Sequence, residues 1–268
     1  MSTWYLILLA LVQGLTEFLP VSSSAHLILL PRLLALPDQG LIFDVAANTG
    51  TFLAVAAYFH RELRRVGRAA LLLPGSEDRD RRLAGHLLVA TVPVLGVGWL
   101  LRDQVATLAR DPVVIAISSI FFGVLLLVAD RWGRKERSLD ELSLREAILI
   151  GLAQALALVP GTSRSGITIT AGLGAGLRRE QAARFSFLLL VPVSAAAAVH
   201  ELGGLTGVTP DVATVWQLAV VVLVSAVSGF AVIHFFLGLL RRYSLTVFVV
   251  YRILLGLALL WPGLWTSR

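Results

Sequence analysis

Long apolar runs separated by short polar segments dominate this chain. Two of them, "VVIAISSIFFGVLLLVA" and "VWQLAVVVLVSAVSGFAVIHFFLGLL", contain no Asp, Glu, Lys or Arg. The core of a bilayer is about 30 Å thick, and a helix of about 20 apolar residues crosses it. The pattern therefore predicts an all-α polytopic membrane protein. Six full transmembrane helices are expected, at residues 43–59, 85–101, 113–130, 183–199, 215–240 and 245–262.

Two further apolar stretches are interrupted by a proline and a serine-rich segment. Residues 4–36 contain "PVSSSAH", and residues 146–176 contain "PGTSRSG". The second stretch starts and ends beside basic segments, so it enters the membrane and returns to the same side. Each arm of the first stretch is roughly 15 residues, about 22 Å of helix, which is short for a full span. Both stretches are interpreted as re-entrant helical hairpins that meet near the midplane. Two ordinary short spans are the alternative for the first.

The basic residues mark one side of the membrane. Lys and Arg gather between the apolar stretches, at residues 60–82, 131–145, 177–180 and 241–243, whereas residues 37–40 and 200–214 contain none. Basic loops stay in the cytoplasm, so the formal net charge of +6 reflects topology rather than nucleic-acid binding. The chain has no cysteine, which excludes disulfides and thiolate chemistry.

The two interrupted stretches also resemble each other. "LALVQGLTEFLPVSSSAH" and "LIGLAQALALVPGTSRSG" share a glutamine, a proline and a polar break, and the prolines are 140 positions apart. Three spans follow each break, so the second half is inserted upside down. The pattern predicts one membrane domain, residues 1–268, built from inverted repeats at 1–130 and 145–264 with a cytoplasmic linker at 131–144. Inverted repeats form their sites at the midplane from broken helices.

The residues at the two breaks are typical of a phosphate site. Helix N-termini bind anions, and serine hydroxyls add donors. Arg164 supplies a planar cation that grips phosphate through two hydrogen bonds. Gln13 and Glu17 lie four residues apart, on one helical face. Glu17 can bind a hard divalent cation or act as a base, and His26 can be a nucleophile or a general acid or base.

A single serine in a membrane helix usually bonds only to a nearby carbonyl. Here hydroxyls gather with ionisable groups that are costly in a bilayer, which indicates a functional site. We expect Glu17, Ser23, His26 and Arg164 to be catalytic, Glu17 to be the metal ligand, and Gln13, Ser22, Ser24, Ser163, Ser165 and Thr168 to bind substrate. Arg252 and His234, in late spans, are interpreted as structural.

With these residues identified, the chain resembles the undecaprenyl-diphosphatase family of the bacitracin-resistance type. The resemblance covers essentially the whole length and rests on "QGLTEFLPVSSSAH", "FDVAANTGTFLAVAAYF" and "PGTSRSGITITAGLGAGLRREQAARFSFLLLVPV". It implies hydrolysis of undecaprenyl diphosphate to the monophosphate carrier used in peptidoglycan and other envelope polymers. It also implies a divalent cation (Mg²⁺ or Ca²⁺), interlocked inverted repeats, and a site opening to the outer side of the bacterial cytoplasmic membrane. Membrane lipids and the polyprenyl diphosphate are the expected partners, with no nucleic acid and a possible homodimer.

The motifs of the family carry over residue by residue. Its (E/Q)xxxE motif matches Gln13 and Glu17, and the glutamine replaces a second glutamate found in many members. This departure concentrates the acid–base and metal roles on Glu17. The PxSSxxH and PGxSRSxxT motifs match Pro20, Ser22, Ser23, His26, Pro160, Gly161, Ser163, Arg164, Ser165 and Thr168. Ser23 is the preferred nucleophile, with His26 as the alternative.

A transporter is the rival hypothesis. Inverted repeats with broken helices are a transporter architecture, so the chain could flip the polyprenyl phosphate carrier, with or without hydrolysis. A carrier needs to bind phosphate but does not need a group that transfers protons. The glutamate, serine and histidine within ten residues of one break therefore favour an enzyme. Buried charges disfavour a purely structural protein.

Overall fold

A computed structural model describes residues 1–101, 104, 111–204 and 211–261 of the chain. Apart from one isolated β-bridge between Arg137 and Leu177, its regular structure in this part of the chain is helical. The α-helices are α1 (Thr3–Thr16), α2 (Ser23–Leu33), α3 (Leu41–Tyr58), α4 (His60–Ala70), α5 (Asp78–Leu100), α7 (Pro112–Trp132), α8 (Leu144–Ala155), α9 (Arg164–Gly174), α10 (Arg179–Gly204), α11 (Val212–Leu240) and α12 (Thr246–Leu259). Two short 3₁₀ helices, η1 (Leu139–Glu141) and η2 (Leu156–Leu158), lie on either side of α8.

Five helices of the described residues are long and apolar enough to cross a membrane: α3, α5, α7, α10 and α11. They coincide with five of the six predicted spans, which confirms a multi-pass membrane protein. The sixth predicted span corresponds to α12, which has 14 residues and a length of about 21 Å. Residues 262–264, at the predicted end of the second repeat, lie outside the described residues.

The first basic segment is a helix rather than the predicted loop. Within residues 60–82 the chain forms α4 and then starts α5. Val66 and Ala69 are buried at helical spacing on the face of α4 that packs against α5, whereas Arg61, Arg64 and Arg68 are exposed. The prediction of a loop was wrong because the few apolar residues of α4 gain burial only against a partner helix.

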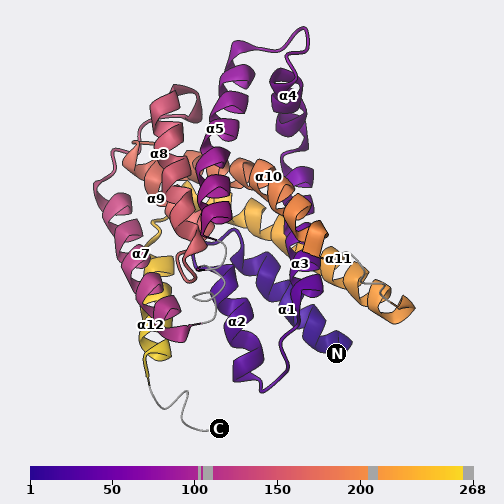
Figure 1. The fold of residues 1–268 in the computed structure, drawn as a ribbon. Coiled ribbons are helices and arrows are strands. Elements are labelled where there is room, and N and C mark those ends of the chain that lie inside the picture. Colours follow the sequence, from indigo (N-terminus) through magenta and orange to yellow (C-terminus); the bar gives the residue numbers. More distant parts are fainter. Residues whose placement is uncertain (102–103, 105–110, 205–210, 262–268) are drawn as a thin grey trace.

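Helices from the two ends of the chain are interleaved. α11 packs against α1 and α3, α8 packs against α5, and α12 packs against α7 (Figure 1). Small residues permit the closest approaches. A Cβ on Gly50 of α3 would lie 2.5 Å from the carbonyl oxygen of Val222, and one on Gly151 of α8 would lie 2.5 Å from that of Ala90. Such contacts between small residues are usual where helices associate in a bilayer.

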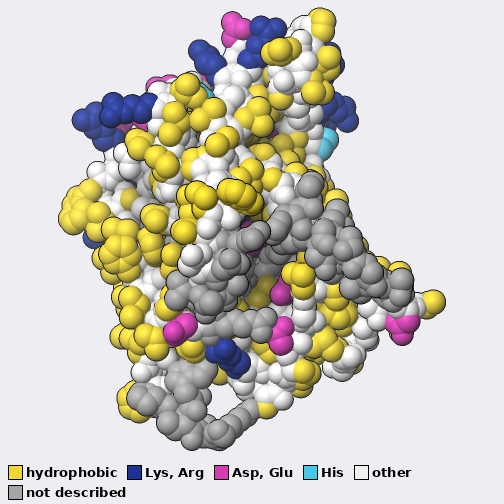
Figure 2. Space-filling view, in the orientation of Figure 1, with side chains coloured by type: hydrophobic (Ala, Val, Ile, Leu, Met, Phe, Trp, Pro, Cys, Tyr) yellow, Lys and Arg dark blue, Asp and Glu magenta, His cyan; other side chains and the backbone are white. Residues whose placement is uncertain are grey.

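The outer surface is strongly apolar. Figure 2 shows Lys and Arg side chains gathered at the upper end of the view and its left edge, above a broad hydrophobic surface. Among the exposed apolar side chains, Val92 is 66% exposed, Phe235 73% and Leu254 61%. Exposed side chains of this kind on candidate spans suit contact with lipid tails, whereas the arginines suit the membrane boundary.

Candidate active site

The first break lies between α1 and α2. Glu17 caps the C-terminal end of α1, and the chain then passes Pro20 before α2 begins at Ser23. Ser22 has φ +70° and ψ +89°, a left-handed conformation that is costly for a residue with a side chain. The turn therefore places Ser23 at the first position of α2, directly behind a strained residue.

The second break lies between η2 and α9 and also has a left-handed serine directly before its helix. Gly161 has φ +88° and Ser163 has φ +70°, and α9 begins at Arg164. The hydroxyl of Ser118, on α7, donates to the carbonyl of Pro160. The hydroxyl of Ser163 accepts from the N–H of Gly166 at 3.1 Å and so caps α9.

The two breaks can be aligned on their left-handed serines. The hydroxyls of Ser22 and Ser24 are 3.2 Å apart, and those of Ser163 and Ser165 are also 3.2 Å apart. In this alignment the residue that opens the helix is Ser23 in one break and Arg164 in the other. The first residue of the helix is therefore a hydroxyl residue in the first break and a cation in the second.

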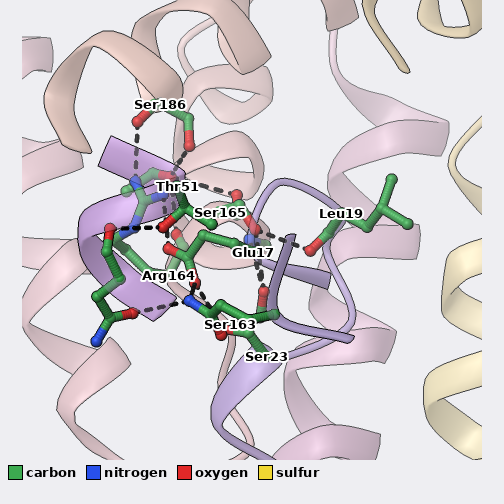
Figure 3. Close-up of polar contacts among 12 residues, drawn as sticks. Glu17, Leu19, Ser23, Thr51, Ser163, Arg164, Ser165 and Ser186 are labelled. Atoms are coloured by element: carbon green, nitrogen blue, oxygen red, sulfur yellow. Dashed lines mark hydrogen bonds and ion pairs between the residues drawn. The ribbon is translucent and has the colours of Figure 1, made fainter. Parts of the chain in front are cut away.

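Glu17 connects the two breaks. Its Oε2 accepts from the hydroxyl of Ser23 at 2.6 Å and from the amide of Gln13 at 3.3 Å, and its Oε1 accepts from Nη2 of Arg164 at 3.2 Å. Figure 3 shows Glu17 between Ser23 of one break and Arg164 of the other. The Glu17 and Arg164 side chains are only 15% and 16% exposed. The predicted i, i+4 pairing of Gln13 with Glu17 is confirmed.

A cavity of about 330 Å³ opens beside this network. It is lined by Glu17, Val45, Asn48, Thr49, Phe52, Arg164, Ser194, Ala195, Ala197 and Ala198. The charged pair contributes to its polar part together with Asn48, Thr49 and Ser194, and apolar side chains of α3 and α10 form the remainder. Asn48 also accepts from the amide of Gln13 at 2.7 Å, so α3 contributes a polar side chain to the site. A phosphate on an apolar chain suits such a mixed lining.

His26 has both ring nitrogens engaged. Its Nδ1 lies 2.7 Å from the carbonyl oxygen of Ser22, and its Nε2 lies 2.5 Å from the hydroxyl of Tyr251 on α12. A carbonyl only accepts, so Nδ1 carries the hydrogen in this arrangement and the phenol donates to Nε2. The two rings also stack, with centroids 5.7 Å apart. The lone pair of His26 therefore points at a phenol, and sequence reasoning missed Tyr251.

Arg252, the next residue of α12, holds the backbones of both breaks. It is fully buried, and its guanidinium donates to the carbonyls of Ser119 (3.1 Å), Pro20 (3.4 Å), Gly161 (2.9 Å) and Thr162 (2.8 Å). Its contacts are with backbone carbonyls, as the structural interpretation expected. The sequence did not predict that Arg252 lies between the two breaks. An arginine within an apolar span does, however, indicate a specific partner or function.

Two of the predicted substrate-binding hydroxyls also bond within the protein. Ser165 donates to the carbonyl of Leu19 at 2.9 Å and so ties the second break to the first. Thr168 donates to the carbonyl of Arg164 at 2.8 Å and lies 2.7 Å from the hydroxyl of Ser186. Ser186, which was not predicted, also accepts from Nη1 of Arg164 at 2.9 Å through its carbonyl. These contacts orient Arg164 toward Glu17.

The oxygen atoms near Glu17 suit a divalent cation that is shared with a phosphate ligand. Within the described residues no three His, Cys, Asp or Glu side chains are grouped closely enough to hold a metal. Glu17 supplies a carboxylate, and Oε1 of Gln13 is a buried oxygen without a hydrogen-bond partner in the structure. Magnesium commonly uses one or two carboxylates together with phosphate oxygens. The residues present therefore fit a cation completed by a bound diphosphate.

Together the fold and the site define a multi-pass membrane protein in which Glu17, Arg164 and Ser23 form a largely buried polar network. Residues 6–258 match the family described as "Bacitracin resistance protein BacA", and the chain belongs to this family. The undecaprenyl-diphosphatase of Magnetococcus marinus is 49% identical over 258 residues, covering 94% of this chain and 96% of that protein. The undecaprenyl-diphosphatase of Alcanivorax borkumensis is 49% identical over 263 residues, covering 97% and 98% of the two chains.

Proposed function

We propose that this chain hydrolyses undecaprenyl diphosphate to undecaprenyl phosphate and inorganic phosphate, and so recycles the lipid carrier of cell-envelope polymers. Membership of the family and the names of the two relatives support this activity. The observation that carries it in the structure is the 2.6 Å hydrogen bond from Ser23 to Glu17, on a carboxylate that also binds Arg164. A nucleophile, a base and a phosphate-binding cation thus meet beside one cavity.

In the proposed reaction Ser23 attacks the terminal phosphorus. Its proton passes to Glu17 while the new O–P bond forms, and the bond from that phosphorus to the bridging oxygen breaks, releasing undecaprenyl phosphate. Glu17 gives this proton to the departing undecaprenyl phosphate or to solvent and is again a carboxylate. Water then attacks the phosphoserine and passes a proton to Glu17, which returns it to the serine oxygen as the O–P bond breaks and inorganic phosphate leaves. Arg164 neutralises charge on the transferring phosphoryl group, which is the main source of rate in such reactions.

We assign His26 a positioning role. It holds the carbonyl of Ser22, the residue before Ser23, while Tyr251 occupies its other nitrogen. Tyr251→Phe removes the phenol and is expected to lower kcat about 3- to 10-fold with KM little changed. Phe235→Leu, at an exposed site on α11, serves as the control. A trapped phospho-adduct that is acid-labile, as phosphohistidine is, would contradict the assignment and favour His26 as the nucleophile.

A divalent cation, Mg²⁺ or Ca²⁺, is part of the proposal. Glu17 and Oε1 of Gln13 would hold it together with oxygens of the diphosphate. When bound, it supplies positive charge that polarises the phosphoryl oxygens. Removal of the cation with EDTA is expected to abolish phosphate release, and added Mg²⁺ or Ca²⁺ to restore it. Equilibrium binding of Mn²⁺, measured by its paramagnetic resonance, should need both the diphosphate and Glu17.

We also propose the finer architecture predicted from the sequence: inverted repeats at 1–130 and 145–264, joined by residues 131–144, with two re-entrant hairpins. The left-handed serine shared by the two breaks supports it, as does the reciprocal packing of α1 on α11 and of α8 on α5. Basic loops on one side support an inner-membrane protein whose site opens outward. The natural absence of cysteine permits single-cysteine labelling: Asp38→Cys should react from outside, and Arg64→Cys only after permeabilisation. The homodimer stays a prediction.

The first test is phosphate release from a long-chain prenyl diphosphate by the purified protein in detergent. Detergent removes compartments, so a pure flippase would release no phosphate. Wild-type protein should release phosphate, and Glu17→Ala should release almost none. Ser228→Ala is the matched control because its hydroxyl bonds to the carbonyl of Val224 on its own helix. An inactive wild-type protein that still binds the lipid would refute the proposed activity.

A further inference from the structure

A second cavity lies at one end of the helix bundle, apart from the site of Glu17. It has a volume of about 390 Å³ and is lined by Lys135, Arg178, Arg179, Glu180, Gln181, Leu240 and Arg241. None of these residues lines the first cavity. The candidate spans α7 and α11 end beside it, at Trp132 and Leu240, and α10 begins there. Three span ends place this basic pocket at the membrane boundary.

The carboxylates around the basic pocket are already engaged. Glu180 binds Arg241 through both oxygens, at 2.9 Å to Nε and 2.8 Å to Nη2. Asp130, which is 1% exposed, accepts from Nε of Arg179 at 2.5 Å and from the N–H of Leu245 at 3.0 Å. Each carboxylate therefore has both oxygens engaged by its own protein partners.

The cations of the basic pocket keep spare donors. Arg178 is exposed, and its side chain makes no ion pair within the described residues. Lys135 donates to the main-chain carbonyl of Asp130 at 2.5 Å, which leaves its charge uncompensated. The lining has four cations and one carboxylate, and even with nearby Asp130 and Glu141 counted the cations remain in excess. Such a pocket suits an anion with several acceptor oxygens, which is what a phosphate offers.

An apolar groove flanks the same corner of the fold. It has a volume of about 450 Å³ and is lined by Leu239, Tyr243, Ser244, Thr246, Val247 and Val250. Leu239 of this groove precedes Leu240 of the basic pocket, and Tyr243 lies two residues after Arg241. The end of α11 and the turn that follows it thus contribute residues to both cavities. A ligand that occupies both has an anionic head and an apolar chain.

We propose that the basic pocket binds the phosphate of an anionic phospholipid, with an acyl chain lying along Val247 and Val250. Basic pockets between spans at the cytoplasmic side of a membrane bind such head groups. A phosphate from solution would use the same cations but would gain nothing from the apolar groove. The presence of that groove beside the pocket therefore favours the lipid over free phosphate.

Native mass spectrometry of the full chain in detergent tests this site. The probe is phosphatidylglycerol, with zwitterionic phosphatidylcholine for comparison. Wild-type protein should retain one tightly held phosphatidylglycerol, and Lys135→Ala combined with Arg178→Ala should weaken this binding roughly 30-fold. Arg64→Ala combined with Arg68→Ala removes the same charge from exposed positions of α4 and should leave the binding unchanged.

Further arms separate the sources of the phosphate. Inorganic phosphate or glycerol phosphate at millimolar concentration should not displace the lipid, whereas Val247→Asp, in the apolar groove, should weaken its retention. Equal retention of both lipids would overturn the proposal, and so would equal loss in both double variants or displacement by free phosphate. Thermal unfolding of each variant without lipid checks that it folds. Phosphate release from the prenyl diphosphate should be unchanged in detergent, so this test is independent of the catalytic site.

Discussion

The break before α2 and the break before α9 share a left-handed serine directly before the helix but differ in chemistry. Ser22 and Ser163 share a φ of +70°, and each pairs with the serine two residues later at 3.2 Å. The next residue is Ser23 in one break and Arg164 in the other, and both bind Glu17. The residue after each left-handed serine is therefore a hydroxyl in the first break, the proposed nucleophile, and a cation in the second, and Glu17 joins the two.

The two breaks also differ in how their helices are capped. Ser163 caps α9 through the N–H of Gly166, whereas Ser22 makes no side-chain cap on α2. The first turn of any helix has N–H groups without partners inside the helix. Those of α2 remain available beside Ser23, where the proposed reaction develops negative charge. The first break therefore leaves N–H groups free beside Ser23, whereas the second uses Ser163 to stabilise the helix that carries Arg164.

The largest effect should come from the serines themselves. Ser23→Ala removes the proposed nucleophile and is expected to lower kcat about 10³-fold, with lipid binding and folding retained. Ser163→Ala removes only a helix cap, so we expect a loss of about 1 kcal/mol of stability and an activity within roughly tenfold of wild type. Phosphate release and thermal unfolding measure both. If Ser23→Ala and Ser163→Ala lower kcat equally, the proposal that only Ser23 takes part in the chemistry is wrong.

Arg164 should come next. Arg164→Lys keeps the charge but cannot reach Glu17 and the carbonyl of Ser186 with one planar group. We expect kcat/KM to fall about 10²-fold. Arg184→Lys is the matched control because Arg184 pairs with Glu62 outside the site. If both lysine variants lose the same activity, Arg164 stabilises the fold rather than the reacting phosphate.

Arg252 tests whether the two breaks must be held together. Arg252→Met leaves the carbonyls of Pro20, Gly161 and Thr162 without their shared donor inside the protein. We expect a loss of stability on the order of 3 kcal/mol, and a lower kcat because Ser23 and Arg164 lose their alignment. Thermal unfolding in detergent and phosphate release give the two readouts. Arg242→Met, at an exposed arginine in the turn before α12, should change neither. An equally stable Arg252→Met protein would refute the tether.

The smallest effect concerns the helices that precede the two breaks, α8 and α1. On α8, Glu146 binds Arg137 of the linker through both oxygens at 2.5 and 3.1 Å. On α1, Tyr5 makes a neutral hydrogen bond to Gln39. The hydrogen bond from Arg137 is the main cause that lowers the pKa of Glu146 from 4.5 to about 2. Glu146 lies outside the candidate spans.

A lowered folded-state pKa adds stability above the unfolded value, and this stability disappears as the pH falls through the folded value. The contribution of Glu146 should thus be complete at neutral pH and be lost between about pH 4.5 and pH 2. Glu146→Gln should lower the thermal midpoint by a few degrees at pH 7 and much less near pH 2. Tyr5→Phe should show no such pH dependence. A constant difference across this range would contradict the ion pair.

Much of this protein could be predicted from local patterns alone. Runs of apolar residues long enough for a bilayer located five spans, because every span must satisfy its own backbone and face lipid. Prolines within apolar stretches located both breaks, and the four-residue spacing of Gln13 and Glu17 placed them on one face. Glu17, Ser23 and Arg164 were predicted as site residues because they belong to a polar cluster within apolar stretches. Ionisable groups are costly in a bilayer, so such a cluster indicates a function.

Only the tertiary structure decided which of the polar groups meet. Tyr251 reaches His26, and Arg252 reaches both breaks, from a helix more than 200 positions away from the first break. Ser165 and Thr168, which are predicted substrate ligands in their motif, bond to Leu19 and Ser186 within the protein. α4 became a helix only by packing on α5. Local sequence sets spans and breaks because helix formation and lipid contact act on neighbouring residues, whereas each of these contacts depends on how distant helices pack.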